Sequence, residues 1–274
     1  MRRRGWPALA LVVLAGVAAA APPRAPLVAA HRGGAGLWPE NSLTAFRGAV
    51  ALGVDALEFD VHLTADGVPV VIHDVTLDRT TTARGLVRAT TLEALRAARL
   101  LDRSGAPTED RVPTLAEVLE VAAPAPVAVL PEIKVDVVRG RYPDIETHVV
   151  ALLRAYGLTA RASVQSFDDA TLRRLRALDP ALRTMLLVGR VRMVAAMATG
   201  ADAVRWAQDV GAGDLGIEHR LIDADLVAAA RAAGIRVAAW TVNEDADVRR
   251  LSALGVDVVM TDRPDRVRRL LVIP

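Results

Sequence analysis

The chain is 274 residues long, 52% hydrophobic and nearly neutral, with a formal net charge of +2 at pH 7. A chain of this length can bury one full hydrophobic core. It contains no cysteine, which excludes disulfides, zinc–thiolate sites and thiol catalysis. Aromatic residues make up only 3% of the chain, too few for the stacking platforms that bind single-stranded nucleic acids, so we expect no nucleic-acid partner.

The first 21 residues are typical of a secretory signal peptide. Three arginines at positions 2–4 precede an apolar run that begins at Trp6, and small residues stand at Ala18 and Ala20. An uncleaved membrane anchor is the alternative, which the sequence disfavours because the run is short, is interrupted by Pro7 and ends in alanines. Removal of the segment takes three positive charges away and leaves the mature chain at −1, so the charge balance says little about partners.

Residues 22–274 alternate short apolar runs with amphipathic segments, as expected of one α/β domain. Asn, Asp or Ser opens most of the amphipathic segments and Gly closes many of them, which is the usual capping chemistry of helices. Eight strands, each followed by a helix, predict a TIM (β/α)8 barrel. The expected strands are 27–31, 56–61, 127–134, 160–167, 182–188, 214–219, 235–242 and 256–262.

One further run, 68–74, follows the second strand after only four residues. A gap this short allows an antiparallel hairpin but no parallel crossover. In such a hairpin the numbers of facing residues add up to about 132, which places His73 beside Phe59 and Asp60. Residues 75–126 then hold turns and two helical pieces, which we expect to form a small insertion over the barrel mouth.

Carboxylates stand near the ends of two of the predicted strands, where the chemistry of such barrels lies. Glu58 and Asp60 are two residues apart and share one strand face, as do Glu132 and Lys134. Carboxylates in an all-parallel barrel are costly unless they are paired or bound to a cation. Three converging carboxylates without thiolates suit Mg²⁺ or Ca²⁺. An ion-pair cluster with Lys134 and inward arginines is the other interpretation of this pattern.

Histidines reach the same end of the barrel from two directions. His31 and Arg32 follow the first strand, and the predicted hairpin brings His73 back to the carboxylates. Two histidines beside a hard metal ion suit general acid and base catalysis of phosphoryl or acyl transfer at neutral pH. Lys134 is the only lysine in the chain, and a compact charge at this point suits a phosphate oxygen. An arginine-rich composition explains a single lysine equally well.

The other histidines carry weaker signals. His148 lies within a predicted helix, and we expect it at the surface or half buried. Glu218 and His219 end a strand, so one of them is a candidate for the lining of the pocket. His62 shares strand parity with Asp60, which places it either at the rim or in solvent.

Six segments in order, "HRGGAGLWPENS", "ALEFDVHLTADGVPVVIHD", "PEIK", "VQSF", "AAWTVN" and "VMTDRP", resemble the signature of the glycerophosphodiester phosphodiesterase family. The resemblance runs from about Leu27 to Pro264. It departs from the family pattern at Ser42, where Thr is more usual, and His62 occupies a position that varies. The resemblance implies a metal-dependent TIM-barrel enzyme that hydrolyses glycerophosphodiesters to glycerol 3-phosphate and an alcohol.

Carried over residue by residue, the resemblance also implies the centre of the site. Glu58, Asp60 and Glu132 match the family's metal ligands for a divalent cation. His31 and His73 match its acid–base pair, which in this superfamily can act through attack by the substrate's own neighbouring hydroxyl.

The remaining matches concern the substrate and the shape of the site. Arg32 and Lys134 would neutralise charge on the phosphorane-like transition state. Trp240 would pack against the glycerol carbons. Glu40 and Asn41 would hold the shape of the site or contact the metal's outer shell. The glycines of the first loop would let the backbone approach the phosphate.

Two alternatives use the same barrel. An enzyme of the sphingomyelinase or lysophospholipase D type shares the two histidines, but such proteins usually have Asp in place of Glu132 and carry disulfides, unlike this chain. A non-catalytic binder of phospholipid head groups is expected to have lost a histidine or a metal carboxylate, and all five are present here. The sequence carries no pattern that selects an oligomeric state.

The signal-peptide interpretation predicts an exported protein, periplasmic or secreted, whose mature chain begins near Ala21 or Pro22. N-terminal sequencing of the native protein, combined with cell fractionation, measures this directly. Recovery of a chain that begins at Met1 or Arg2 would contradict the prediction.

Overall fold

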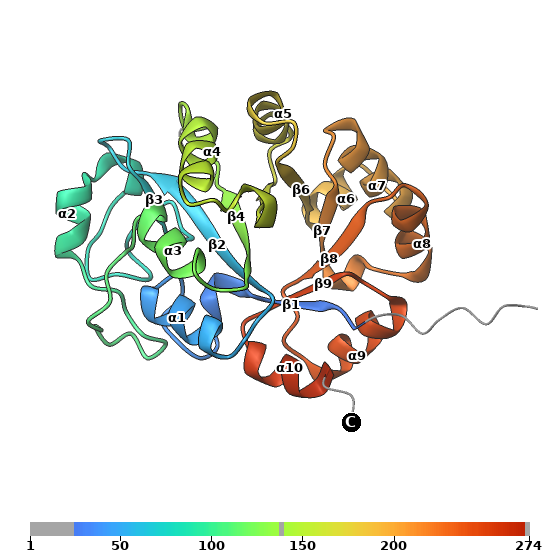
Figure 1. The fold of residues 1–274 in the computed structure, drawn as a ribbon, viewed down its shortest axis with the longest axis horizontal. Helices are drawn as coiled ribbons and strands as arrows, with labels where there is room; N and C mark the ends of the chain where they lie inside the picture. The colour runs from blue at the N-terminus through green and yellow to red at the C-terminus, as the bar shows by residue number, and fades with distance from the viewer. Residues whose placement is uncertain (1–24, 137–139, 272–274) are drawn as a thin grey trace, which may run out of the picture.

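The computed structural model of the chain describes residues 25–136 and 140–271, so the expected signal peptide lies outside the described residues. Eight parallel strands follow one another in the order β1-β9-β8-β7-β6-β5-β4-β2, and a further pairing of β1 with β2 closes the barrel. The TIM barrel predicted from the sequence is therefore confirmed (Figure 1). The barrel strands are β1 (Leu27–Ala30), β2 (Ala56–Leu63), β4 (Ala128–Ile133), β5 (Ser163–Ser166), β6 (Arg183–Val188), β7 (Asp214–Glu218), β8 (Arg236–Trp240) and β9 (Val258–Thr261).

A ring of helices surrounds the strands (Figure 1). Side-chain caps begin several of them, as the sequence predicts: the Ser42 hydroxyl accepts from the Ala45 N–H, and Asp168 and Asp223 cap two later helices in the same way. The ring helices are α1 (Leu43–Ala51), α3 (Leu115–Ala122), α4 (Ile145–Ala155), α5 (Asp169–Leu178), α7 (Gly200–Asp209), α8 (Ala224–Ala232), α9 (Asp245–Leu254) and α10 (Pro264–Leu271). Two more helices, α2 (Leu92–Ala97) and α6 (Arg190–Ala195), lie outside this ring order, together with the short 3₁₀ helices η1 (His31–Gly33), η2 (Val87–Ala89), η3 (Thr159–Arg161) and η4 (His219–Leu221).

Successive side chains of each strand point alternately toward the helices and into the barrel, so the core has two parts. Leu57, Phe59 and Val61 of β2 are fully buried in the large cluster between the strands and the helices. Glu58 and Asp60, one position out of step, point into the barrel at its mouth. A smaller apolar cluster fills the middle of the barrel and is formed by Ala29, Ala56, Leu130, Met185, Leu187, Ala238, Val258 and Met260.

The predicted hairpin is present. The one strand outside the barrel ring in the described residues, β3 (Pro69–Val71), runs antiparallel to the end of β2, with Val61 opposite Val71. This is the register predicted from the sequence. β1 pairs with only the first two residues of β2, so the same edge of β2 is free for β3 further along. The Ile72 N–H then donates to the Asp60 carbonyl at 3.0 Å, which carries His73 back to the carboxylates.

The expectation that both helical pieces of residues 75–126 lie over the barrel mouth is wrong for α3. Its apolar residues Leu115, Val118, Leu119 and Ala122 recur at helical spacing and are all fully buried in the main core. To bury that face, α3 takes the ring position between α1 and α4. The segment before it, with α2, forms a lobe beside the hairpin with a small core of its own, formed by Val70, Ile72, Leu77, Val87, Leu95, Leu100 and Val112.

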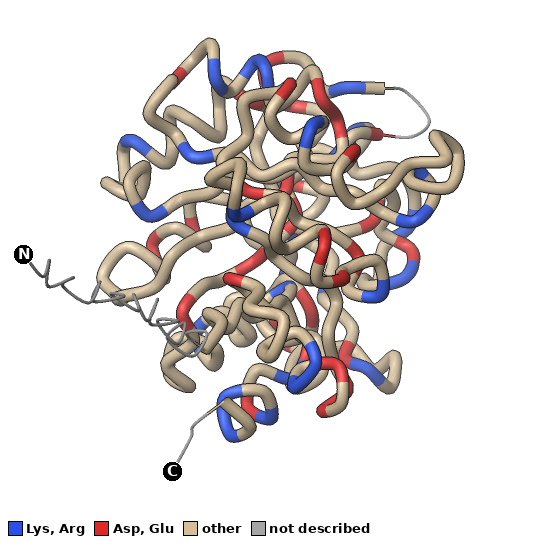
Figure 2. The backbone as a smooth tube through the Cα atoms, turned by 90° about the vertical axis from the view of Figure 1, so that its right-hand side faces the viewer, with Lys and Arg blue, Asp and Glu red and all other residues tan. Residues whose placement is uncertain are grey.

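The opposite end of the barrel holds a separate polar cluster. Asp214, at the start of β7, is 1% exposed and accepts hydrogen bonds from Arg183, Arg236 and Ser163. Two guanidinium groups and a hydroxyl thus compensate one buried carboxylate. On the side of the molecule seen in Figure 2, acidic and basic residues are interspersed along the backbone. Among the described residues, no helix has both the length and the apolar character needed to span a bilayer.

Candidate active site

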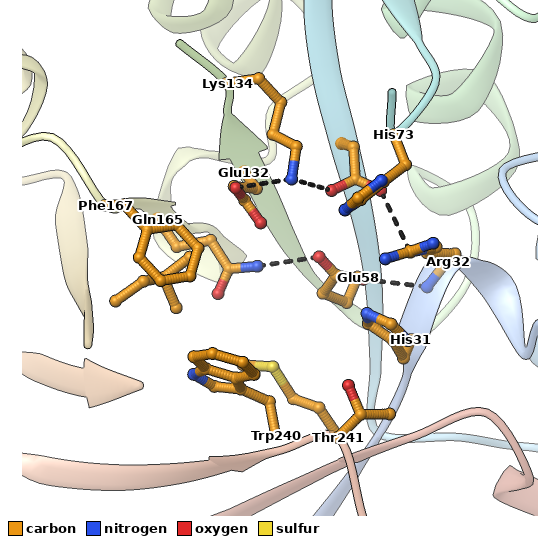
Figure 3. A pocket seen from close by; sticks show the side chains of 13 residues that line it. His31, Arg32, Glu58, His73, Glu132, Lys134, Gln165, Phe167, Trp240 and Thr241 are labelled. Atoms are coloured by element: carbon orange, nitrogen blue, oxygen red, sulfur yellow. Dashed lines mark hydrogen bonds and ion pairs between the residues drawn. The ribbon is translucent and has the colours of Figure 1, made fainter. Parts of the chain in front are cut away.

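A cavity opens at the carboxyl ends of the barrel strands (Figure 3). Strands or the loops that follow them contribute every side chain in its wall, so the barrel itself sets the geometry. The wall is formed by His31, Arg32, Glu58, Asp60, His73, Glu132, Lys134, Gln165, Phe167, Leu187, Trp240, Thr241 and Met260.

Three buried carboxylates form the centre of the cavity. Oxygen atoms of Glu58, Asp60 and Glu132 all lie within 4.8 Å of one another. The parallel pairing of β2 with β4 places Asp60 directly opposite Glu132, which brings the two strands' carboxylates together. The side chains are at most 10% exposed, so the repulsion between them is screened only weakly by water.

Cationic side chains compensate two of these carboxylates. The Lys134 ammonium group lies 3.1 Å from an Asp60 oxygen and 2.8 Å from a Glu132 oxygen. The Arg32 Nε lies 3.5 Å from the other Asp60 oxygen. Glu58 instead accepts from two neutral donors, the Gln165 amide and the Arg32 backbone N–H, each at 2.9 Å, and pairs with no Lys or Arg side chain in the part of the chain that the structure describes.

The pKa values follow this unequal compensation. Burial, reinforced by the Asp60 and Glu132 carboxylates, raises the pKa of Glu58 well above its usual range. Burial also raises the pKa of Glu132, although Lys134 opposes the shift. For Asp60, burial acts upward too, but Lys134, His73 and Arg32 outweigh it and hold the pKa of that carboxyl far below its usual range. Glu58 is therefore the carboxylate that most needs an additional positive charge.

A carboxylate fixes the imidazole of His31. The Nδ1 of His31 lies 2.6 Å from an oxygen of Asp262, which follows β9, and the other Asp262 oxygen accepts from the Asn243 amide at 2.7 Å. Burial acts to lower the pKa of His31, but Glu58 and Asp262 outweigh it and the pKa is raised. Because Nδ1 is taken by Asp262, Nε2 is the nitrogen left for the cavity.

His73 is held in the same manner from the hairpin side. Its Nδ1 lies 2.7 Å from an oxygen of Asp74, which also binds Arg79. Burial, together with Lys134 and Arg32, lowers the pKa of His73 despite the nearby Asp60 carboxylate. Figure 3 shows both imidazoles directed at the cavity, near Glu58 and the guanidinium of Arg32.

Glu40 and Asn41 lie behind the cavity wall. One Glu40 oxygen accepts from the Arg32 guanidinium at 2.9 Å, and Arg79 binds both Glu40 oxygens at 2.8 Å. The Asn41 amide donates to Asp60 at 2.9 Å. These contacts hold Arg32 and Asp60 in place.

The glycines of the first loop do not approach the cavity. A Cβ atom on Gly33 would lie 2.8 Å from the Cβ of Ala45, and one on Gly36 would lie 2.6 Å from the Asp262 carbonyl oxygen. The expectation that these glycines admit a phosphate is therefore wrong. They allow the loop to pack closely against α1 and against the segment after β9, while Arg32 itself adopts a left-handed backbone at φ 52°.

Aromatic side chains form the far wall. Trp240 contacts Phe167 edge to face, with ring centroids 5.6 Å apart, and both face the histidines across the cavity (Figure 3). Phe167 is 48% exposed and reaches solvent at the mouth. The indole N–H of Trp240 is buried and has no partner within the described residues.

Other polar residues lie elsewhere. His148 is exposed on α4, as expected. Neither Glu218 nor His219 contributes to the cavity wall; Glu218 accepts from the Arg190 N–H, and His219 lies near Asp247. Neither candidate lines the pocket, because Glu218 is bonded to the start of α6 and His219 lies beside α9.

His62 also differs from expectation. It is fully buried rather than at a solvated rim, because β3 and the segment around Tyr142 cover it.

The sequence did not indicate the residues that orient His31 and Glu58. Asp262 and Gln165 were recognisable only as polar residues at strand ends, and Asn243 gave no signal. Their importance depends on partners more than 100 residues away for Gln165 and more than 200 for Asp262, which no local pattern reports.

Comparison with known proteins gives a consistent result. The family model of the glycerophosphoryl diester phosphodiesterase family matches residues 31–266. The chain belongs to this family. It is 34% identical over 246 residues to a glycerophosphodiester phosphodiesterase of Caldanaerobacter subterraneus subsp. tengcongensis, an alignment that covers 89% of this chain and 97% of the relative.

Solved structures of similar proteins share the barrel. A glycerophosphodiester phosphodiesterase from Agrobacterium tumefaciens superposes with a TM-score of 0.74 at 26% identity, covering 89% of this chain and 99% of its own. An Oleispira antarctica phosphodiesterase in complex with the product sn-glycerol-3-phosphate gives a TM-score of 0.76 at 26% identity, covering 90% and 96%.

The arrangement of oxygen atoms fits a divalent cation. Glu58, Asp60 and Glu132 offer hard anionic ligands from three positions on two strands. The Oε1 of Gln165 is a buried acceptor beside Glu58 that has no partner within the described residues. An unpaired buried oxygen next to an undercompensated carboxylate is what a cation or its coordinated water would satisfy.

Substitution of Glu132 tests this site. We expect Glu132→Gln to keep the fold, since the change is isosteric, and to weaken binding of Mg²⁺ or Ca²⁺ by at least about 10-fold, because one anionic ligand is lost. Titration calorimetry with the metal alone measures the effect, and Glu120→Gln, a change on the outer helix α3, is the matched control. An unchanged titration for the Glu132 variant would place this residue outside the metal's ligands.

Proposed function

We propose that this protein hydrolyses glycerophosphodiesters to glycerol 3-phosphate and an alcohol, with a divalent cation held by Glu58, Asp60 and Glu132. The single observation that carries the proposal is the meeting of these carboxylates with two carboxylate-oriented histidines in one cavity. Membership of the family and the product complex of the Oleispira relative support the same reaction. When bound, the cation would neutralise charge on the phosphoryl oxygens.

The cavity wall supplies complementary groups for such a substrate. Arg32 and Lys134 offer positive charge at the carboxylate end, where a phosphodiester would lie, and both are held by ion pairs before any substrate arrives. Trp240 offers an apolar face for the glycerol carbons.

The two histidines are placed to move protons. Each uses Nδ1 to bind a carboxylate, which fixes the ring and leaves Nε2 directed at the cavity. A base is needed to take the proton from the attacking hydroxyl, and an acid is needed to protonate the departing alcohol. With water as the attacking group, one histidine in each role completes the hydrolysis. With the substrate's own glycerol hydroxyl, the same exchange releases the alcohol and leaves a cyclic phosphate, and a second exchange with the two roles reversed lets water open it to glycerol 3-phosphate.

The reaction is tested by release of glycerol 3-phosphate from a panel of glycerophosphodiesters with choline, ethanolamine, inositol and glycerol as the alcohol. We expect turnover with at least one of them, loss of turnover with EDTA, and recovery on addition of Mg²⁺ or Ca²⁺, because the three carboxylates require a cation. Full activity of metal-stripped protein would refute the metal, and inactivity on the whole panel under all conditions would refute the reaction.

The acid–base assignment is tested by His31→Ala and His73→Ala. Proton transfer by a positioned side chain contributes about 10²–10⁴-fold in rate, so each variant should lose about that factor in kcat while KM stays within a few fold. The double variant should be little worse than the poorer single one, because groups that act together are not additive. Exposed His148→Ala is the control and should be unchanged. Near-normal turnover in His73→Ala would show that this histidine takes no part.

A further inference from the structure

A buried chain of hydrogen bonds runs behind His73. His62 of β2, with no exposed surface, places Nδ1 2.8 Å from the Tyr142 hydroxyl and Nε2 3.1 Å from the backbone carbonyl oxygen of His73. A carbonyl only accepts, so Nε2 carries the proton and donates it, and Nδ1 accepts from the Tyr142 hydroxyl. One neutral tautomer satisfies both contacts.

The tyrosine is itself fixed on its other side. Tyr142 is buried and contacts the His62 ring edge to face, with centroids 5.5 Å apart. The Arg88 guanidinium lies 4.8 Å from the centre of the Tyr142 ring and forms an ion pair with Asp136 at 3.2 Å. Tyr142, which orients His62, is therefore held both by Arg88 of the lobe and, through Arg88, by Asp136 of the segment after β4.

His73 needs such support because strand pairing has ended before it. The ladder between β2 and β3 stops at Val71, and the last backbone bond of this pairing is that of Ile72 to Asp60. At the side chain, His73 is held by Asp74, whose partner Arg79 is 48% exposed. The contact from His62 is the buried, short-range restraint on the backbone of His73.

We propose that His62 is a positioning residue for His73: through its Nε2–H it fixes the His73 carbonyl, and thereby the distance of the His73 imidazole from the cavity. This inference rests on the proposed function, in which His73 transfers a proton. Displacement of a catalytic group by about 1 Å can cost about 10²-fold in rate. Loss of a partner that orients a metal-binding histidine, a comparable role, typically costs about 10–100-fold in activity.

Three substitutions at residue 62 separate the two contacts. His62→Gln can place its amide N–H near the position of Nε2, so it keeps the bond to His73 and loses the bond to Tyr142. His62→Asn has the reverse effect, because its shorter side chain reaches only as far as Nδ1. His62→Leu removes both bonds at similar volume. We expect kcat within about 5-fold of wild type for the Gln variant and about 10–100-fold lower for the Asn and Leu variants.

Several readouts distinguish positioning from general stability. In all three variants KM and the metal titration should stay within a few fold, and the loss in kcat should not follow the change in Tm. Tyr142→Phe keeps the bond to His73 and should therefore resemble the Gln variant. If the wild type is active and the Leu variant turns over as fast, or if the Gln variant is as slow as the Leu variant at equal Tm, the inference is wrong. An inactive wild type would instead refute the proposed function.

Discussion

The buried meeting of three carboxylates is the constraint on which the rest of the structure depends. At an effective dielectric constant of about 20, two like charges about 4 Å apart repel by about 4 kcal/mol. The three pairs among Glu58, Asp60 and Glu132 are held at this kind of separation, and a typical folded domain is stable by only about 5–15 kcal/mol. The barrel must therefore both enforce the separation and supply positive charge to it.

The positive charge around the three carboxylates is unevenly distributed. Lys134 and Arg32 supply two positive charges for three negative ones, and they lie nearer to Asp60 than to Glu58. The remaining deficit is at Glu58, whose pKa rises in response. A divalent cation would remove the deficit without a change in the fold, so the charge imbalance that destabilises the site would also be the source of the proposed affinity for metal.

Strand parity made much of this site predictable. A period of two places Glu58 with Asp60 and Glu132 with Lys134, and the register of a short hairpin brings His73 to Asp60. The position of α3 was not predictable in the same way, because an amphipathic helix shows which face it buries and not which neighbour it meets. The contacts of the loop glycines, Asp262 and Asn243 could not be predicted either, because the residues that they contact belong to other strands and helices. The burial of His62 was not predicted, because strand parity gives the face on which a side chain lies but not whether another segment, here the one around Tyr142, covers that face.

The barrel interior keeps its two polar ends apart. The carboxylates lie at the mouth, and Asp214 with Arg183 and Arg236 lies at the other end. Between them is the apolar layer that includes Met185 and Leu187, packed so closely that a Cβ atom on Gly216 would lie 2.6 Å from Leu187 and 2.8 Å from the sulfur of Met185. Such a layer is packed at the density expected of a protein interior. Asp214 is compensated by the guanidinium groups beside it, so the base of the barrel draws no charge from the mouth, and the mouth can retain uncompensated charge while stability is supplied elsewhere.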